Sequence, residues 1–179
     1  MPANTPPEPW LSFLREIDGF LAEETQINCL GGFVITQVYG AARSTADVDV
    51  LTMVNVVPGL FGFAGEGSEL HKRYKVYLDP VGIATLPENY ADRLTEIFPG
   101  AFHRLKLFGV DAYDLALAKI ERNIERDRDD VKHLARAVPF DLDTLRTRYN
   151  DELRAYLGNA KREDLTLKLW IEMIEETRQ

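Results

Sequence analysis

The sequence predicts an α+β fold, a small mixed sheet flanked by helices with a helical C-terminal part. Strand-like runs are concentrated in the first 110 residues, whereas the remainder has the 3.6-residue periodicity of helices. With 179 residues and 45% hydrophobic content, the chain can bury a sizeable core. We therefore expect a core over residues 1–110 and a helical region over 111–179 packed on it, together one compact unit.

In the first half of the chain, apolar spacing and turn residues mark the elements. The apolar residues of 10–21 recur at helical spacing, and Pro58-Gly59 ends an apolar run rich in Val, Leu and Met. In order, we expect a helix over 10–21, a strand over 27–30, a helix over 32–40, a strand over 47–56, a loop over 59–67 and a short helix over 68–72.

In the second half, proline and glycine separate the elements. Asp79-Pro80 ends a strand, Pro99-Gly100-Ala101 joins a hairpin, Asp111 is placed to cap a helix, and Gly158-Asn159 separates the last two helices. In order, we expect a strand over 74–78, a helix over 87–91, a hairpin of 93–98 and 103–108, and helices over 112–122, 127–137, 141–157 and 160–177.

The most informative feature is the pair Asp47 and Asp49 at the start of the second strand. Side chains alternate along a strand, so both carboxylates project from one face, about 6–7 Å apart. Two neighbouring carboxylates in a core strand repel each other and lose solvation. A divalent cation relieves both costs, and oxygen ligands suit magnesium. The pattern predicts a metal site.

A Gly31-Gly32 pair lies between the first strand and the helix that follows. Glycine allows the backbone to approach a bound group closely, and a helix N-terminus favours an anion such as phosphate. A loop carrying Arg43, Ser44 and Thr45 joins this segment to the two aspartates. A phosphate-binding site beside a metal-binding site is typical of enzymes that transfer phosphoryl or nucleotidyl groups.

These residues resemble a known family. Gly31-Gly32, Tyr39-Gly40, Arg43-x-Thr45 and Asp47-x-Asp49 look like the signature of minimal nucleotidyltransferases of the DNA polymerase β-type superfamily. Downstream, Lys119 followed by Arg126-Asp127-x-x-Asp130 resembles a motif of bacterial abortive-infection and type IV toxin–antitoxin nucleotidyltransferases. The resemblance covers roughly residues 10 to 150.

The resemblance implies a nucleotidyltransferase fold and a metal-dependent enzyme that moves a nucleoside monophosphate from an NTP, such as ATP, to an acceptor hydroxyl. The metal is Mg²⁺ or Mn²⁺. Its implied site residues fall into three groups: Asp47, Asp49 and Asp79 as metal ligands and catalytic groups; Gly31, Gly32, Arg43, Thr45 and Asp127 at the nucleotide; and Lys119 at the leaving pyrophosphate.

Three of these residues have simpler interpretations. Asp79 precedes a proline, and Asp-Pro is an ordinary strand terminator. Lys119 could be a surface lysine on an amphipathic helix. Asp127 could be a helix N-cap, with Asp130 three positions later completing a capping box.

The resemblance leaves the acceptor open between tRNA and a protein, and it implies a cognate antitoxin as a partner. A second hypothesis is a small-molecule acceptor, as in antibiotic-modifying relatives. A third, from another class, is a nucleotide-binding or partner-binding module without turnover. Retention of Asp47 and Asp49 favours an active enzyme.

Composition excludes several other classes. A net charge of −8 argues against broad, non-specific nucleic-acid binding. No stretch approaches the roughly 18 apolar residues of a membrane span. The single cysteine, Cys29, cannot form an internal disulfide, so we expect a cytoplasmic protein in a reducing environment.

Overall fold

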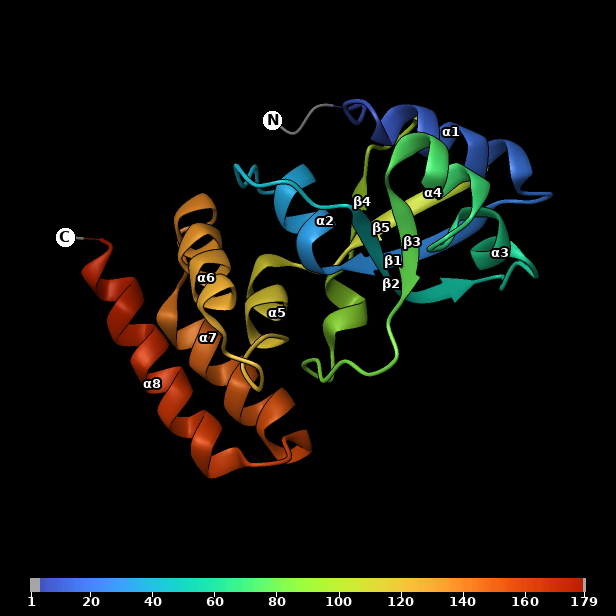
Figure 1. Ribbon diagram of the computed structural model, residues 1–179. Helices are drawn as coiled ribbons and strands as arrows, with labels where there is room; N and C mark the ends of the chain where they lie inside the picture. Colours follow the sequence, from blue (N-terminus) through green and yellow to red (C-terminus); the bar gives the residue numbers. More distant parts are fainter. Residues whose placement is uncertain (1–3, 179) are drawn as a thin grey trace. The chain divides into compact units, whose positions relative to one another are not determined.

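The computed structural model describes residues 4–178 (Figure 1), so the ends of the two expected regions, residues 1–3 and 179, lie outside the described residues. The chain divides into two compact units. The first contains Met1–Gly82 and Leu94–Val110, and the second contains Ile83–Arg93 and Asp111–Gln179. All strands lie in the first unit and the second is helical, which confirms the α+β class.

The first unit is built on a five-stranded mixed sheet with strand order β3-β2-β1-β5-β4. Strands β1 and β5 are parallel, as are β2 and β3, whereas β1 with β2 and β4 with β5 are antiparallel. β2 is therefore an interior strand, as predicted, and β3 lies at the edge. The strands are β1 (Thr25–Leu30), β2 (Asp47–Val54), β3 (Tyr77–Pro80), β4 (Thr95–Ile97) and β5 (Leu105–Gly109).

Alternation along β2 separates a buried face from a face that carries carboxylates. Val48 and Val50 are buried, whereas Asp47 and Asp49 are half-buried on the opposite face. Beyond them, Asn28 of β1 pairs with Thr52 and Cys29 with Val50, so Leu51 is an extra residue, a β-bulge. The alternation predicted from sequence thus holds where the aspartates lie and changes phase after them.

Four helices accompany the sheet: α1 (Trp10–Phe20), α2 (Gly31–Gln37), α3 (Leu60–Ala64) and α4 (Glu69–Tyr74). The apolar stripe of α1 is buried, from Trp10 through Ile17. Complete burial of one such side chain stabilises a fold by about 1.5–3 kcal/mol. The Trp10 ring meets Phe33 of α2 edge-on, with centroids 4.8 Å apart, so the two helices share one core.

Two predicted elements of this unit differ from the structure. The expected loop over 59–67 contains α3, because Leu60 and Ala64, one helical turn apart, are both fully buried and offset the cost of Gly62. The expected strand over 74–78 begins later, at Tyr77. Tyr74 still belongs to α4, and Lys75 ends that helix in the left-handed conformation with φ 62°.

The second unit consists of helices. These are η1 (Tyr90–Arg93), α5 (Ala112–Leu117), α6 (Glu125–Ala137), α7 (Leu142–Arg148), η2 (Tyr149–Leu153), η3 (Arg154–Tyr156) and α8 (Ala160–Glu176). The helix expected over 87–91 is the short 3₁₀ helix η1. The helix expected over 112–122 stops at Leu117, and a tight turn follows in which Asn123 has φ 44° and accepts a hydrogen bond from the Trp170 indole. The helix expected over 141–157 changes to a π-helical turn at Tyr149.

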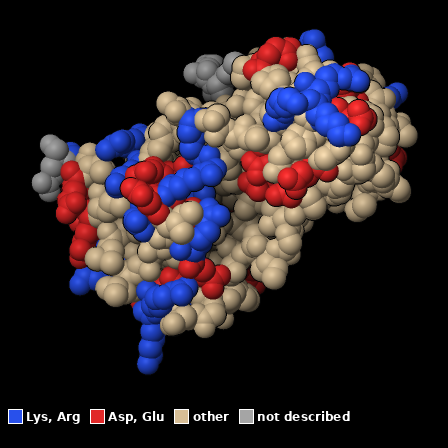
Figure 2. Space-filling view, in the orientation of Figure 1, with Lys and Arg blue, Asp and Glu red and all other residues tan. Residues whose placement is uncertain are grey.

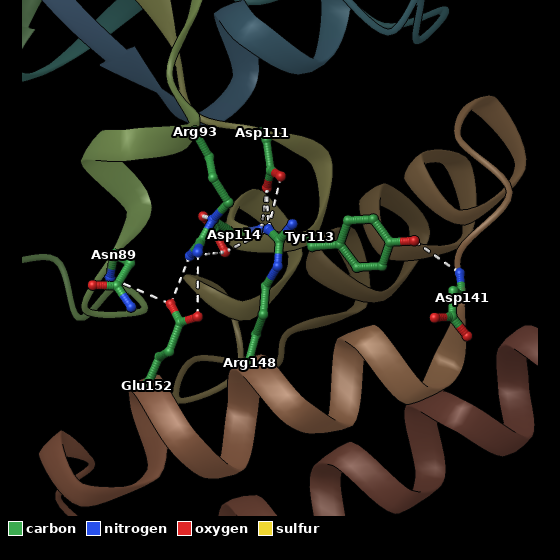
Figure 3. Close-up of polar contacts among 8 residues, drawn as sticks. All are labelled: Asn89, Arg93, Asp111, Tyr113, Asp114, Asp141, Arg148 and Glu152. Atoms are coloured by element: carbon green, nitrogen blue, oxygen red, sulfur yellow. Dashed lines mark hydrogen bonds and ion pairs between the residues drawn. The ribbon is translucent and has the colours of Figure 1, made fainter.

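A network of arginines and carboxylates fixes the early segment 83–93 within this unit (Figure 3). Arg93 donates from Nε to Asp114, at 2.8 Å, and from Nη2 to Glu152, at 2.7 Å. Arg148 donates to Asp111 and also to Asp114. Burial raises the pKa of the Asp114 carboxyl despite the two guanidinium groups. Removing either arginine would therefore leave a buried carboxylate undercompensated.

Candidate functional site

Three carboxylates gather where β2 and β3 lie side by side. Asp49 of β2 pairs in register with Asp79 of β3, and Asp47 lies two residues earlier on the same face. One carboxylate oxygen from each residue can be chosen so that all three lie within 4.8 Å of one another. The structure thus unites the sequence pair with a third acidic residue from a neighbouring strand.

This donor set fits a hard divalent cation. Magnesium and manganese prefer carboxylate oxygens, and they usually keep several waters and share their remaining positions with substrate phosphates. All three aspartates are half-buried, which leaves room for such additional ligands. Without a cation, three carboxylates this close would repel one another. The residues that would hold the ion are Asp47, Asp49 and Asp79.

Gly31 lies against this cluster. Its φ of +72° is a backbone conformation that other residues rarely adopt. A Cβ atom added there would lie 1.8 Å from Oδ2 of Asp49 and 2.8 Å from its Cγ. Glycine is therefore required at position 31 for two reasons: the backbone has a positive φ, and the Asp49 carboxylate occupies the space of a side chain.

Gly32 is buried and lies close to the loop residues that the sequence singled out. A Cβ atom at Gly32 would lie 3.0 Å from Thr45 Oγ1 and 3.1 Å from a guanidinium nitrogen of Arg43. Thr45 also donates a hydrogen bond of 2.8 Å to Oδ1 of Asp47. The loop therefore lies next to Gly32, and the hydroxyl of its Thr45 orients the carboxylate of Asp47.

Sequence reasoning missed two aromatic residues beside the cluster. Tyr77 of β3 pairs in register with Asp47, and its ring lies 4.6 Å from the ring of His71, centroid to centroid. Partial burial and then the charge of Asp47 raise the pKa of the Tyr77 hydroxyl. Alternation could have identified Tyr77, because it lies two residues before Asp79.

The second unit holds the downstream motif. Lys119 is only 8% exposed, and its Nζ lies 3.1 Å from Asp130 and 3.6 Å from Asp127. The interpretation of Lys119 as a solvated surface lysine is therefore wrong. Lys119 lies in the turn after α5, which ends at Leu117, so helical periodicity could not indicate its burial.

Asp127 is the third residue of α6 rather than its N-cap, so the predicted cap position is wrong, although its carboxylate does take part in capping this helix. The N-cap position is Ile124, whose backbone N–H donates to the Asp127 carboxylate. Burial acts to raise the pKa of Asp127, but the hydrogen bond from Arg122 and the charge of Lys119 outweigh it, and the net pKa is lowered. Asp127 is thus held ionised between two cations.

The site residues expected from sequence thus fall in both units. In the first unit, the structure brings together Gly31, Gly32, Arg43, Thr45, Asp47, Asp49 and Asp79, whereas Lys119 and Asp127 belong to the second. Cys29 is fully buried, and burial raises the pKa of its thiol, so it has the properties of a core residue and not of a nucleophile.

A mixed sheet with a carboxylate cluster on adjacent strands, next to a glycine pair, defines a protein of the nucleotidyltransferase class. Residues 16–178 match the family described as a nucleotidyltransferase of unknown function, DUF6036. The chain belongs to this family, which confirms the resemblance to nucleotidyltransferases seen in the sequence. No curated protein and no solved structure is similar enough to the chain to count as a match. Within residues 4–178, no helix is long and apolar enough to cross a bilayer.

Proposed function

We propose that this protein is a metal-dependent nucleotidyltransferase that transfers a nucleoside monophosphate from an NTP to an acceptor hydroxyl. The observation that carries the proposal is the approach of the Asp47, Asp49 and Asp79 oxygens to within 4.8 Å of one another. Family membership supports the general reaction. Mg²⁺ or Mn²⁺ is the proposed ion, and when bound it would neutralise charge on the triphosphate.

The proposed triphosphate seat is the surface formed by Gly31, Gly32, Arg43 and Thr45. The two glycines let Asp49, Thr45 and Arg43 approach the start of α2 closely, and the Arg43 guanidinium beside Gly32 is suited to a phosphate. The hydrogen bond from the Thr45 hydroxyl to Asp47 connects this proposed triphosphate-binding surface to the carboxylates. Lys119 and Asp127 are proposed nucleotide-site residues on the resemblance alone, and a Lys119 variant described below tests that role.

In the proposed reaction, the acceptor oxygen attacks the α-phosphorus of the NTP. A bond forms between that oxygen and phosphorus, and the bond from the α-phosphorus to the bridging oxygen of the β-phosphate breaks. Pyrophosphate leaves with the electron pair of the broken bond. The hydroxyl proton passes to the carboxylate of Asp79 or to solvent. The products are the nucleotidylated acceptor and pyrophosphate.

The resemblance to toxin nucleotidyltransferases favours a macromolecular acceptor, RNA or protein, and a cognate antitoxin as a partner. The test is incubation of the pure protein with each α-³²P-labelled NTP, Mg²⁺ or Mn²⁺, and total cellular RNA or soluble protein. We expect label in one macromolecular fraction, with release of pyrophosphate, and none with Asp49→Asn. Nucleotide binding without transfer to any acceptor, small molecules included, would instead identify a binding module.

A further inference from the structure

Four side chains of β2 and β3 form a square block on the carboxylate face of the sheet. Asp47 pairs in register with Tyr77, and Asp49 pairs in register with Asp79. Neighbouring strands lie about 4.8 Å apart, and residues two apart along one strand are separated by about 6–7 Å. Three corners of the block are the proposed metal ligands and the fourth is a tyrosine. Tyr77 therefore borders the proposed metal site without adding a charge to it.

The hydroxyl of Tyr77 faces acidic groups. Partial burial is the largest cause that raises the pKa of this hydroxyl, and the charges of four carboxylates add to it: Asp47, Glu66, Asp79 and Asp49. Figure 2 shows an acidic group of side chains over the region where β2 and β3 lie in Figure 1. Side chains stand roughly perpendicular to a sheet, and a phenol is longer than the side chain of aspartate. The hydroxyl therefore lies further from the sheet than the carboxylates of the two strands.

The ring of Tyr77 is held in place from α4. Its centroid lies 4.6 Å from that of the His71 ring, and the two rings are tilted by 47°. His71 is itself fixed twice, because the backbone N–H of Gly67 donates to its Nδ1 at 2.8 Å and its own backbone N–H donates to Ser68 Oγ at 3.1 Å. Among residues 4–178, the Tyr77 hydroxyl has no hydrogen-bond partner. The protein thus fixes the ring and leaves the hydroxyl available to a group that is not protein.

The surroundings of the hydroxyl indicate what that group is. Magnesium and manganese keep several waters when carboxylates bind them, and these waters need hydrogen-bond acceptors. The oxygen of Tyr77 and the exposed carboxylate of Glu66 can both accept. Gly31 lies against Asp49 at the end of β1, so the proposed triphosphate seat is on the β1 side of β2, whereas Tyr77 is on β3. On the β3 side, the group bound to the cation is therefore water.

We propose that Tyr77 is a positioning residue of the metal site: its hydroxyl binds a water coordinated to the cation, and His71 holds its ring in place. This inference rests on the proposed function, because it concerns the cation of that reaction. A neutral hydroxyl suits this position, since a lysine or arginine there would pair with the carboxylates and compete with the ion. Loss of such an outer hydrogen bond typically weakens metal binding by about 10–100-fold.

The first test is the affinity for Mn²⁺ alone, measured by electron paramagnetic resonance of the free ion. Tyr77→Phe retains the ring and should bind Mn²⁺ about tenfold more weakly than wild type. Tyr74→Phe is the matched control, because it removes a hydroxyl that donates to Glu16 at 3.1 Å, and its affinity should be unchanged. Equal affinities in Tyr77→Phe and wild type would overturn the inference and leave the proposed function standing. A wild-type protein that does not bind Mn²⁺ would contradict the metal-dependent function itself.

The second test observes the coordinated water directly. Electron–nuclear double resonance of bound Mn²⁺ in H₂O and D₂O resolves the exchangeable protons on its waters. We expect these signals to change in Tyr77→Phe and to match wild type in Tyr74→Phe. Calorimetric titration with ATP in the absence of divalent ions should give the same affinity in Tyr77→Phe and wild type. Weaker binding of metal-free ATP would place the hydroxyl on the nucleotide and overturn the inference.

A double-mutant cycle tests the role of His71. If His71 acts only by holding the ring of Tyr77, His71→Ala should weaken Mn²⁺ binding several-fold in the wild type and have no further effect in Tyr77→Phe. Melting temperatures without divalent ions separate this role from a general loss of structure. A Tyr77→Phe variant whose melting temperature without ions falls together with its Mn²⁺ affinity would assign Tyr77 a structural role. Additive losses in the cycle would overturn the role of His71.

Discussion

The carboxylate of Asp49 occupies the space where a side chain of Gly31 would begin, with Oδ2 only 1.8 Å from the position of a Cβ atom. A single methyl group must therefore displace a proposed metal ligand. We predict that Gly31→Ala folds but loses Mg²⁺-dependent transfer. Gly40→Ala is the matched control, because Gly40 has φ +70° and no atom within 4 Å of its Cβ position. Both variants should lose about 1 kcal/mol of stability to backbone strain, measured by urea unfolding. Equal transfer activities in the two would show that the contact with Asp49 is unimportant.

Removal of one carboxylate should separate metal binding from stability. Asp49→Asn relieves repulsion within the cluster, so its melting temperature without divalent ions should equal or exceed that of the wild type. The rise in melting temperature on adding Mg²⁺ should be much smaller than in the wild type, and transfer should be lost. Differential scanning fluorimetry with and without Mg²⁺ measures both shifts. A full magnesium response in Asp49→Asn would remove Asp49 from the metal site.

Thr45 is predicted to act through Asp47. Thr45→Val keeps the shape of the side chain but cannot donate to Oδ1 of Asp47, whereas Thr45→Ser retains the hydroxyl. We expect the valine variant to bind Mn²⁺ several-fold more weakly and the serine variant to remain near wild type. Electron paramagnetic resonance of free Mn²⁺ reports the affinity directly. The interpretation fails if the serine variant is as weak as the valine variant.

Lys119 has both a structural and a proposed catalytic role, and the two can be separated. Lys119→Met leaves Asp127 and Asp130 buried without their shared cation and should cost about 3 kcal/mol of stability. Adding Asp130→Asn to this variant removes one of the two charges and should restore part of that loss. If Lys119 stabilises the leaving pyrophosphate, the double variant should bind NTP within several-fold of wild type but turn over about 10²–10³-fold more slowly. Wild-type turnover in the double variant would leave Lys119 as a structural residue.

The lowered pKa of Asp127 predicts a specific acid sensitivity. An aspartate with a lowered pKa in the folded state contributes stability above its unfolded value of about 4, and it loses that contribution as pH falls through the folded value. The difference in unfolding free energy between wild type and Asp127→Asn should therefore be large at pH 6 and shrink below about pH 4. Urea unfolding at a series of pH values measures it. A difference that does not vary with pH would mean that the carboxylate charge is not what matters.

Short-range pattern was sufficient to locate much of the proposed site. Strict alternation places Asp47 and Asp49 on one face, and Gly31 needs a conformation that only glycine adopts easily, so both are visible in the sequence. Features of the site that depend on the order of the strands in the sheet could not be predicted from local sequence patterns. That Asp79 pairs with Asp49 follows from a parallel pairing between strands separated by two helices, which no local pattern specifies.

Features that depend on tertiary burial were predicted poorly. Lys119 resembles a surface lysine in the sequence, but in the structure it is 8% exposed and paired with Asp127 and Asp130 of α6. α3 has the composition of a glycine-rich loop, and burial of Leu60 and Ala64 is what makes it helical. In each case the free energy comes from contacts between distant residues, which outweigh local preference.

The assignment of residues 83–93 to the helical unit has a consequence for how this protein can be divided. The chain passes from one unit to the other at Gly82, at Arg93 and at Val110, so neither unit is a continuous stretch of sequence. A fragment that ends at Val110 would retain Arg93 but lack Asp114 and Glu152, the carboxylates to which it is bound. A single cut in the sequence therefore separates neither unit intact, and a version of the sheet unit alone needs a short linker in place of residues 83–93.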